Sequence, residues 1–178
     1  MTLDATYPAL ADLRARAKRR LPHFVWEYLD SGTGVDRVVA RNRAVLDAID
    51  FMPAILRGEI DASTEVDFLS STLDMPVGIA PVGMSGLIWP DAERILARAA
   101  SKAGNPYPLS TVASQTPEDV SSALGDHAWL QLYPPRDPEV RRDMLRRAWE
   151  AGFHTAVLTA DLPAASSRER QIRSGLTQ

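Results

Sequence analysis

The 178-residue sequence has no cysteine and few of the other side chains that most often carry reactions. Disulfides, thiolate metal sites and a cysteine nucleophile are therefore excluded. The lysines, Lys18 and Lys102, both fall on expected helices, which argues against a Schiff-base lysine at the end of a strand. The histidines are His23, on an N-terminal helix, and His127 and His154, at the amino ends of expected strands, where a structural role is favoured.

Longer sequence signals are missing as well. No apolar run reaches the roughly 20 residues of a membrane span, and no apolar core follows the basic N-terminal stretch, so we expect no secretory signal in this stretch. We therefore expect a soluble, cytoplasmic protein. The formal net charge of −3 gives no electrostatic case for nucleic-acid binding. No histidine or carboxylate cluster has metal-ligand spacing, and Asp91 and Glu93 are interpreted as acids at the start of a helix.

The composition that remains is that of an ordinary globular protein, 45% hydrophobic and 24% charged, with enough apolar residues for a core. Residues 1–64 are expected to form N-terminal helices, at about 10–21, 22–32 and 35–49, followed by an extended connection. Residues 65–178 are expected to form a second region that begins with a small β-ribbon.

Strand and helix patterns alternate through this second region. Strands are expected at 77–80, 107–110, 128–133 and 155–161, and helices between them at 91–104, 116–125 and 137–152. No hairpin signal separates them, which predicts parallel strands with right-handed crossovers. The short strands end in polar residues, which favours a closed barrel, but an eight-stranded β/α barrel usually needs about 250 residues. The predicted fold class is therefore α/β, with the first four βα units of an incomplete barrel.

Neutral polar side chains gather at the carboxyl ends of the expected strands, where parallel β/α folds bind their ligands. They are Ser110, Thr111, Gln131, Tyr133 and Thr159, together with the acid Asp161. This set suits a polar heterocycle with several donors and acceptors, although each residue could instead only cap the helix that follows. Arg168 is the cation near this rim, and its alternative role is that of a solvated loop charge.

In order and spacing, several stretches resemble the FMN-dependent L-2-hydroxy-acid oxidases and dehydrogenases, a family that includes glycolate and lactate oxidases and mandelate dehydrogenase. The stretches are LPHFVWEYLDSG, VARNRAVLDAI, MPVGIAPVGMSGLIWPDAE, LSTVASQTPEDV, WLQLY, AVLTADLP and SRERQIR. The resemblance implies a TIM (β/α)8 barrel with N-terminal capping helices and FMN as cofactor. It also implies which residues contact the flavin: Pro81, Val82 and Gly83 through their backbone, and Ser110, Gln131 and Thr159 through their side chains.

The resemblance implies substrate-binding and catalytic residues too. Tyr28 and Arg168 would bind the substrate carboxylate, and Tyr133 would contact the substrate and stabilise the transition state. Asp161 would orient the catalytic histidine. Gly83 would line the substrate pocket, and this small residue, together with Val112, favours a bulky, mandelate-like 2-hydroxy acid as substrate.

The chain also departs from the family pattern. The family's catalytic histidine and its phosphate-binding loops belong to the later half of the barrel, so we expect the chain to need a C-terminal half, as a second chain or a missing segment. Complete barrels are expected to form a homo-oligomer, a tetramer. The usual Arg-Pro-Arg after the third helix reads Met52-Pro53-Ala54, and the two-arginine motif is reduced to Ser167-Arg168.

Three functions stay open at this point. The leading one is the N-terminal half of an FMN-dependent oxidoreductase that converts an L-2-hydroxy acid to the 2-keto acid. The alternatives are a non-catalytic half-barrel that acts as an interaction module or is a remnant, and a half-barrel that binds a phosphorylated metabolite.

Overall fold

The computed structural model describes residues 3–53, 55–56, 58–59, 61–160 and 166–176. The chain folds as two compact units, one of residues 1–57 and 163–178 and the other of residues 58–162. Within the described residues, no helix is both long enough and apolar enough to cross a membrane.

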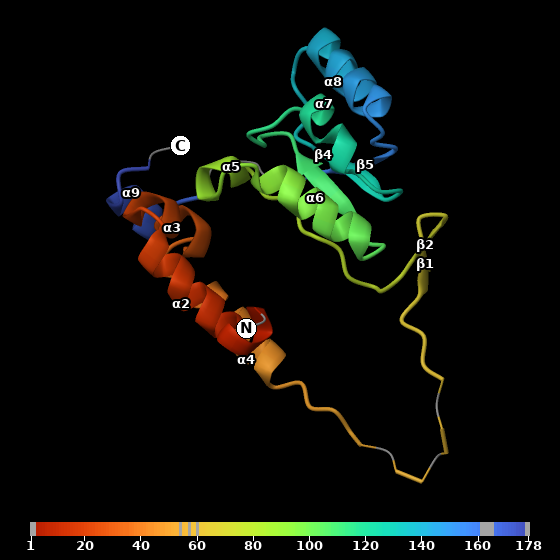
Figure 1. Ribbon diagram of the computed structural model, residues 1–178. Coiled ribbons are helices and arrows are strands. Elements are labelled where there is room, and N and C mark those ends of the chain that lie inside the picture. Colours follow the sequence, from red (N-terminus) through yellow and green to blue (C-terminus); the bar gives the residue numbers. More distant parts are fainter. Residues whose placement is uncertain (1–2, 54, 57, 60, 161–165, 177–178) are drawn as a thin grey trace. The chain divides into compact units, whose positions relative to one another are not determined.

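The first unit is helical and joins the two ends of the chain (Figure 1). Its helices are α1 (Leu3–Thr6), α2 (Leu10–Arg20), α3 (His23–Asp30), α4 (Arg37–Asp47) and α9 (Glu169–Arg173). The expected N-terminal helices are thus confirmed as α2, α3 and α4. The sequence analysis did not predict α9, a short helix that packs against α3.

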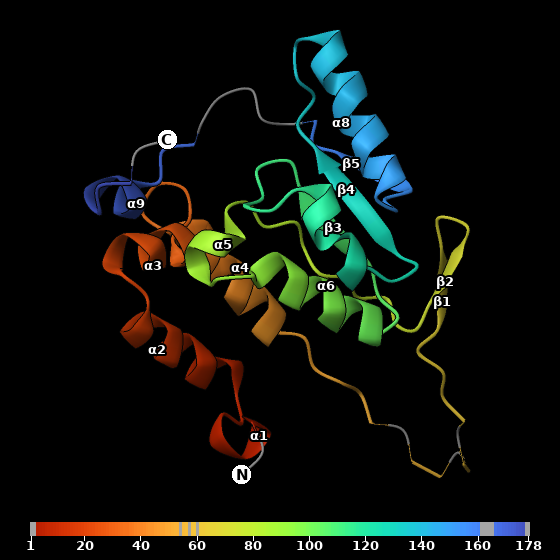
Figure 2. The same cartoon turned by 45° about the horizontal axis from the view of Figure 1, so that its top comes forward.

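The second unit is built on a parallel sheet with strand order β3-β4-β5 (Figures 1 and 2). Its strands and helices follow one another along the chain as β1 (Val66–Phe68), β2 (Ser71–Leu73), α5 (Ser85–Ile88), α6 (Ala92–Lys102), β3 (Tyr107–Ser110), α7 (Pro117–Val120), η1 (Ser121–Ala123), β4 (Ala128–Leu132), α8 (Pro138–Glu150) and β5 (Thr155–Leu158). The expected parallel alternation is confirmed from α6 to β5. The alternation could be predicted because capping residues mark the starts of α7 and α8. The side chain of Thr116 accepts the N–H of Asp119, and that of Asp137 accepts the N–H of Glu139.

The expectation of a strand at 77–80 was wrong. In β3, the N–H of Tyr107 donates across to the β4 side at 3.0 Å. Alternate residues of a parallel strand bond to opposite neighbours, so Pro106 and Pro108 face the 77–80 segment, and proline has no N–H to donate. A single backbone bond remains, from the N–H of Ile79 to the carbonyl of Pro106 at 3.1 Å. The segment therefore lies beside β3 without forming a ladder.

The expected β-ribbon is confirmed as the antiparallel pair β1 and β2. Its turn places Leu69 and Ser70 at φ of 49° and 63°, the left-handed pair that matches the twist of a two-residue hairpin. The ring of Phe68 lies 5.9 Å from that of Trp129 in β4, so an aromatic contact joins the ribbon to the sheet.

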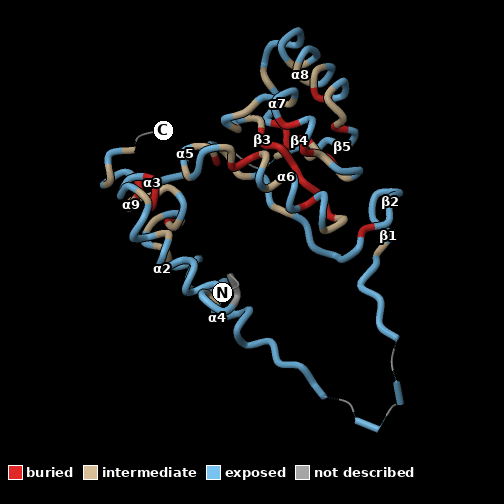
Figure 3. Tube along the Cα trace, in the orientation of Figure 1, coloured by how far each residue is buried: buried red, intermediate tan, exposed pale blue. Residues whose placement is uncertain are grey.

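The core of the second unit lies between the sheet and its helices. Leu109 and Leu130 pack there with Ala97 of α6, Val120 of α7 and Ala148 of α8. Figure 3 shows the buried residues concentrated along β3 and β4. Because side chains alternate along a strand, the residues between these positions point to the opposite face of the sheet.

Candidate functional site

A row of polar side chains crosses the sheet on the face away from the helices. Ser110 is the last residue of β3 and pairs in register with Gln131 of β4. Both side chains alternate with the core leucines, so they lie on the other face. Ser110 is only 7% exposed and Gln131 only 3%. Buried polar groups need partners, and here they find them in each other.

The row continues from Gln131 to the end of β5. The hydroxyl of Ser110 donates to Oε1 of Gln131 at 3.0 Å, and Nε2 of Gln131 donates to Oγ1 of Thr159 at 2.8 Å. These two bonds fix which way the carboxamide points, with its oxygen toward β3 and its nitrogen toward β5. The structure thus brings together the three side chains that the sequence analysis assigned to the cofactor.

Thr111 organises this row, a role that the sequence analysis did not assign. Its hydroxyl donates to the backbone carbonyl of Gln131 at 2.6 Å and accepts the N–H of Tyr133 at 3.0 Å. Its own N–H donates to the same carbonyl at 3.0 Å. Thr111 therefore extends the pairing of β3 and β4 beyond the strand ends. A hydroxyl residue directly after a strand was the available signal.

The other expected residues of this unit lie in the segments around the row. Tyr133 follows β4 and is partly exposed. Pro81 is exposed, whereas Val82 and Gly83 are half-buried in the loop before α5. That loop is tied to the residues after β3, because the N–H of Met84 donates to the carbonyl of Val112 at 2.8 Å. Asp161 lies outside the described residues.

Tyr28 and Arg168, the expected carboxylate-binding residues, are neighbours in the first unit. Nη1 of Arg168 donates to the backbone carbonyl of Tyr28 at 3.1 Å. The preceding residue, Ser167, accepts the N–H of Gly34 through its carbonyl at 2.7 Å. Two backbone-directed bonds thus hold the start of α9 against the end of α3 and the loop after it.

Arg170 strengthens this attachment with an ion-pair cluster. Its guanidinium lies 2.6 Å from a carboxylate oxygen of Glu27, 3.1 Å from one of Asp30 and 2.6 Å from one of Asp36. Arg14 of α2 also pairs with Asp30, through two bonds of 2.7 and 2.9 Å. This cluster could not be predicted from the sequence, because Arg170 is more than 130 residues from its partners.

The cluster shifts the pKa of Asp30, Asp36 and Arg170. Partial burial would raise the pKa of Asp30, but the hydrogen bonds from Arg14 and Arg170 outweigh it and hold that pKa below its usual range. Hydrogen bonds from Arg170 and from the N–H of Gly32 lower the pKa of Asp36. The same carboxylates raise the pKa of Arg170. Asp30, Asp36 and Arg170 are therefore charged at neutral pH.

A parallel β/α sheet with a row of polar side chains at the carboxyl ends of its strands is the arrangement found in the β/α class of proteins, whose ligands bind at that end of the sheet. The chain belongs to the FMN-dependent dehydrogenase family, whose model matches residues 17–178. The resemblance inferred from the sequence is thereby confirmed.

Individual relatives agree with this assignment. The chain is 40% identical over 169 residues to an L-lactate dehydrogenase from Stenotrophomonas maltophilia (strain K279a), covering 95% of this chain and 45% of the relative. It is 36% identical over 170 residues to a 4-hydroxymandelate oxidase from Amycolatopsis orientalis, covering 96% and 47%. It is similar to the crystal structure of mandelate oxidase with 3,3-difluoro-2-hydroxy-3-phenylpropionic acid, with a TM-score of 0.87 and 35% identity over 97% of this chain and 52% of that one. The chain thus spans about half the length of these relatives.

The polar row fits FMN, the cofactor of this family, in the chemistry of its groups. The isoalloxazine ring carries carbonyl and ring-nitrogen acceptors beside an N–H donor, and it is neutral when oxidised. Ser110, Gln131 and Thr159 offer two hydroxyls and one carboxamide, all neutral and able to donate or accept. A neutral row of this kind can exchange its internal hydrogen bonds for bonds to a ring without leaving a charge unpaired.

Proposed function

We propose that this chain supplies the N-terminal βα units of an FMN-dependent enzyme that oxidises an L-2-hydroxy acid to the 2-keto acid. The observation that carries the proposal is the row of buried Ser110, buried Gln131 and half-buried Thr159 at the strand ends, in a chain of the FMN-dependent dehydrogenase family. When bound, FMN supplies the redox chemistry by accepting two electrons from the substrate.

The second unit would hold the flavin ring. Ser110, Gln131 and Thr159 would bind its heteroatoms, and the backbone of Pro81, Val82 and Gly83 would contact its plane. The carboxamide of Gln131 is well suited to this, because its flanking hydroxyls set its orientation before a ligand arrives. Such preorganisation reduces the ordering cost of binding.

The substrate would be bound through its carboxylate. Arg168 can offer two parallel N–H donors to a carboxylate, a geometry that lysine lacks, and the hydroxyl of Tyr28 would add a further donor. Tyr133 would contact the substrate and stabilise the transition state, and Asp161 would orient the catalytic histidine. We propose a mandelate-like substrate, because Gly83 and Val112 are small where a phenyl group would need room.

We further propose that additional βα units complete a closed barrel, either in the same polypeptide or in a second one. The sheet supports this, because the helix layer that covers Leu130 does not extend over β5, where Leu158 is 61% exposed. A sheet with an uncovered apolar edge strand gains stability by pairing further. The tetrameric assembly stays a prediction.

The test is anaerobic reduction of the FMN-loaded full-length protein, followed at the flavin absorbance band. L-mandelate should bleach the flavin and yield the 2-keto acid, with kcat/KM above that for glycolate or L-lactate. Gly83→Ala should lower the ratio of kcat/KM for L-mandelate to kcat/KM for glycolate or L-lactate. Bound FMN that no 2-hydroxy acid reduces would favour a non-catalytic module, and binding of phosphorylated metabolites without FMN would favour the third function.

A further inference from the structure

Glu93, interpreted from the sequence only as an acid at the start of a helix, is buried, and the proposed chemistry gives it no role. It lies in the first turn of α6, where an acid normally faces water, but it is only 1% exposed. A carboxylate can be kept in such a place only if donors replace its lost hydration. The donors that surround Glu93 include backbone N–H groups.

Oε1 of Glu93 accepts two backbone N–H groups from two different segments. Ser114, in the segment after β3, donates at 2.8 Å, and Gly86, in α5, donates at 3.3 Å. Burial would raise the pKa of Glu93, but these donors and the hydroxyl of Ser85 outweigh it, so the pKa lies below its usual range. The group is therefore an anion that joins two segments.

The two segments are also in direct contact. A Cβ added to Gly86 would lie 2.7 Å from the side chain of Ser114, a distance that the folded chain does not allow. The N–H of Met84 donates to the carbonyl of Val112 at 2.8 Å, which makes a second connection. Glycine at position 86 thus allows the close approach that Glu93 secures.

The proposed flavin contacts lie just before Gly86 and Ser114 in the sequence. Pro81, Val82 and Gly83 precede the first segment directly, and Ser110 precedes the second. We propose that Glu93 is a positioning residue: its buried carboxylate sets the spacing between residues 81–86 and residues 110–115, and so the spacing of the groups that hold the flavin ring. This rests on the proposed function, because it takes those groups to be the flavin contacts.

The test compares Glu93→Ala and Glu93→Gln with a matched control in the full-length protein. The control is Phe153→Leu, a core change just before the amino end of β5, at the end of the sheet opposite the two segments. Glu93→Ala should raise the Kd for FMN by about 10-fold or more, because two N–H groups lose a charged acceptor. Glu93→Gln should recover much of the loss, since its Oε1 can still accept both N–H groups. Phe153→Leu should leave the Kd within about 2-fold at a similar loss of stability.

A second readout needs no cofactor. In the FMN-free protein, amide hydrogen exchange at Gly86 and Ser114 should be slow in the parent and in Phe153→Leu and at least about 10-fold faster in Glu93→Ala. If Glu93→Ala and Phe153→Leu give the same Kd and the same exchange rates, the positioning role is overturned. A parent protein that binds no FMN would overturn the proposed function itself, whereas normal FMN binding with no effect of Glu93→Ala would overturn only this inference.

Discussion

The two units hold their candidate site residues by different means. In the second unit, Gln131 and its partners are fixed by short neutral hydrogen bonds above a packed core (Figure 3). In the first unit, α2 and α4 contain no buried residue, although α3 buries Val25 and Trp26. There the attachment of α9 to α3 combines the bond from Arg168 to the carbonyl of Tyr28 with the ion pairs of Arg170. The difference teaches that the proposed cofactor contacts rest on packing and neutral hydrogen bonds, whereas the attachment of α9, which Arg168 precedes, also includes charge pairing. Packing is insensitive to salt and pH, whereas charge pairing is not.

The largest expected effect comes from the core of the second unit. Leu109→Ala removes a side chain that is 1% exposed, and should lower the free energy of unfolding by about 2–5 kcal/mol. The matched change Leu10→Ala in α2 removes a side chain that is 79% exposed and should cost about 0.5 kcal/mol or less. Denaturant unfolding of both variants measures the contrast. Equal losses would show that the two units do not differ in packing as described.

The next effect comes from the ion-pair cluster. Arg170→Ala leaves the mostly buried Glu27 and Asp30 without their shared cation, and should cost about 2 kcal/mol, less than a fully buried pair because Arg170 is partly exposed. The rate of amide hydrogen exchange in α9 should also rise in Arg170→Ala. The control Arg43→Ala breaks an exposed pair with Asp47 and should change little. Unchanged exchange in α9 would show that Arg170 does not hold this segment.

A change within the polar row should be of similar or smaller size. Gln131→Leu removes the acceptor of Ser110 and the donor to Thr159, so at least one buried hydroxyl loses a partner, at about 1–3 kcal/mol. The loss should be the same in low and high salt, unlike that of Arg170→Ala. Thermal unfolding at two salt concentrations separates the two variants, and a salt-dependent loss in Gln131→Leu would contradict the comparison.

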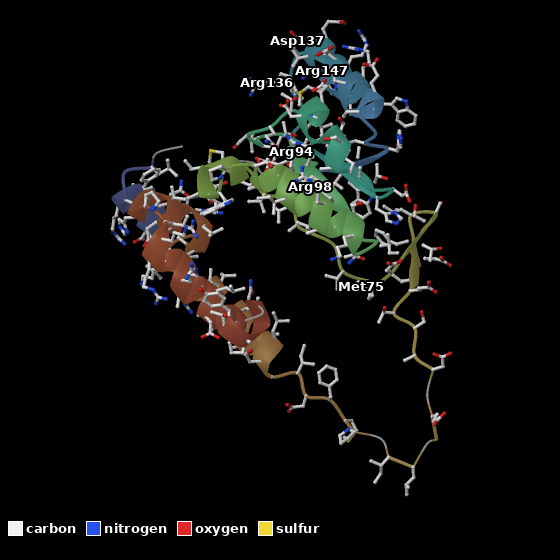
Figure 4. All side chains as sticks on the ribbon, viewed as in Figure 1. Met75, Arg94, Arg98, Arg136, Asp137 and Arg147 are labelled. Atoms are coloured by element: carbon white, nitrogen blue, oxygen red, sulfur yellow. The ribbon has the colours of Figure 1, made fainter. Side chains whose placement is uncertain are left out.

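The smallest effect concerns an exposed charge pair of the second unit. Arg147, labelled in Figure 4, reaches from α8 to Glu118 of α7 through two bonds of 2.7 and 2.9 Å. The pKa of Glu118 is lowered from 4.5 to about 2, and the hydrogen bond from Arg147 is the main cause. Because the folded pKa is the lower one, this pair stabilises the fold above pH 4.5 and the contribution is lost as the pH falls toward 2. The difference in unfolding free energy between the parent and Glu118→Gln should shrink across that window, and a constant difference would contradict it.

Much of the second unit was predictable because its signals are local. Thr116 and Asp137 cap helices that follow strands of alternating or continuous apolar character, and those elements lie where the sequence predicts. The prediction of a strand at 77–80 was wrong because such a strand would have to accept N–H groups from the facing edge of β3. That edge presents Pro106 and Pro108, which have no N–H to donate. Ser110, Gln131 and Thr159 were found because strand ends meet at one edge of a parallel sheet.

What could not be predicted depends on contacts distant in sequence or on the direction of one side chain. An acid in the first turn of a helix reads the same whether it faces water or, like Glu93, the protein interior. The attachment of α9 rests on Arg170 and carboxylates far back along the chain, for which no spacing rule exists.

The most direct test of the central claim is a crystal structure of the full-length protein with FMN bound. The account predicts the flavin ring within hydrogen-bond distance of the side chains of Ser110 and Gln131, with the backbone of residues 81–83 against the ring. A flavin ring bound elsewhere, with the Ser110–Gln131–Thr159 bonds unchanged and buried beneath other side chains, would contradict it.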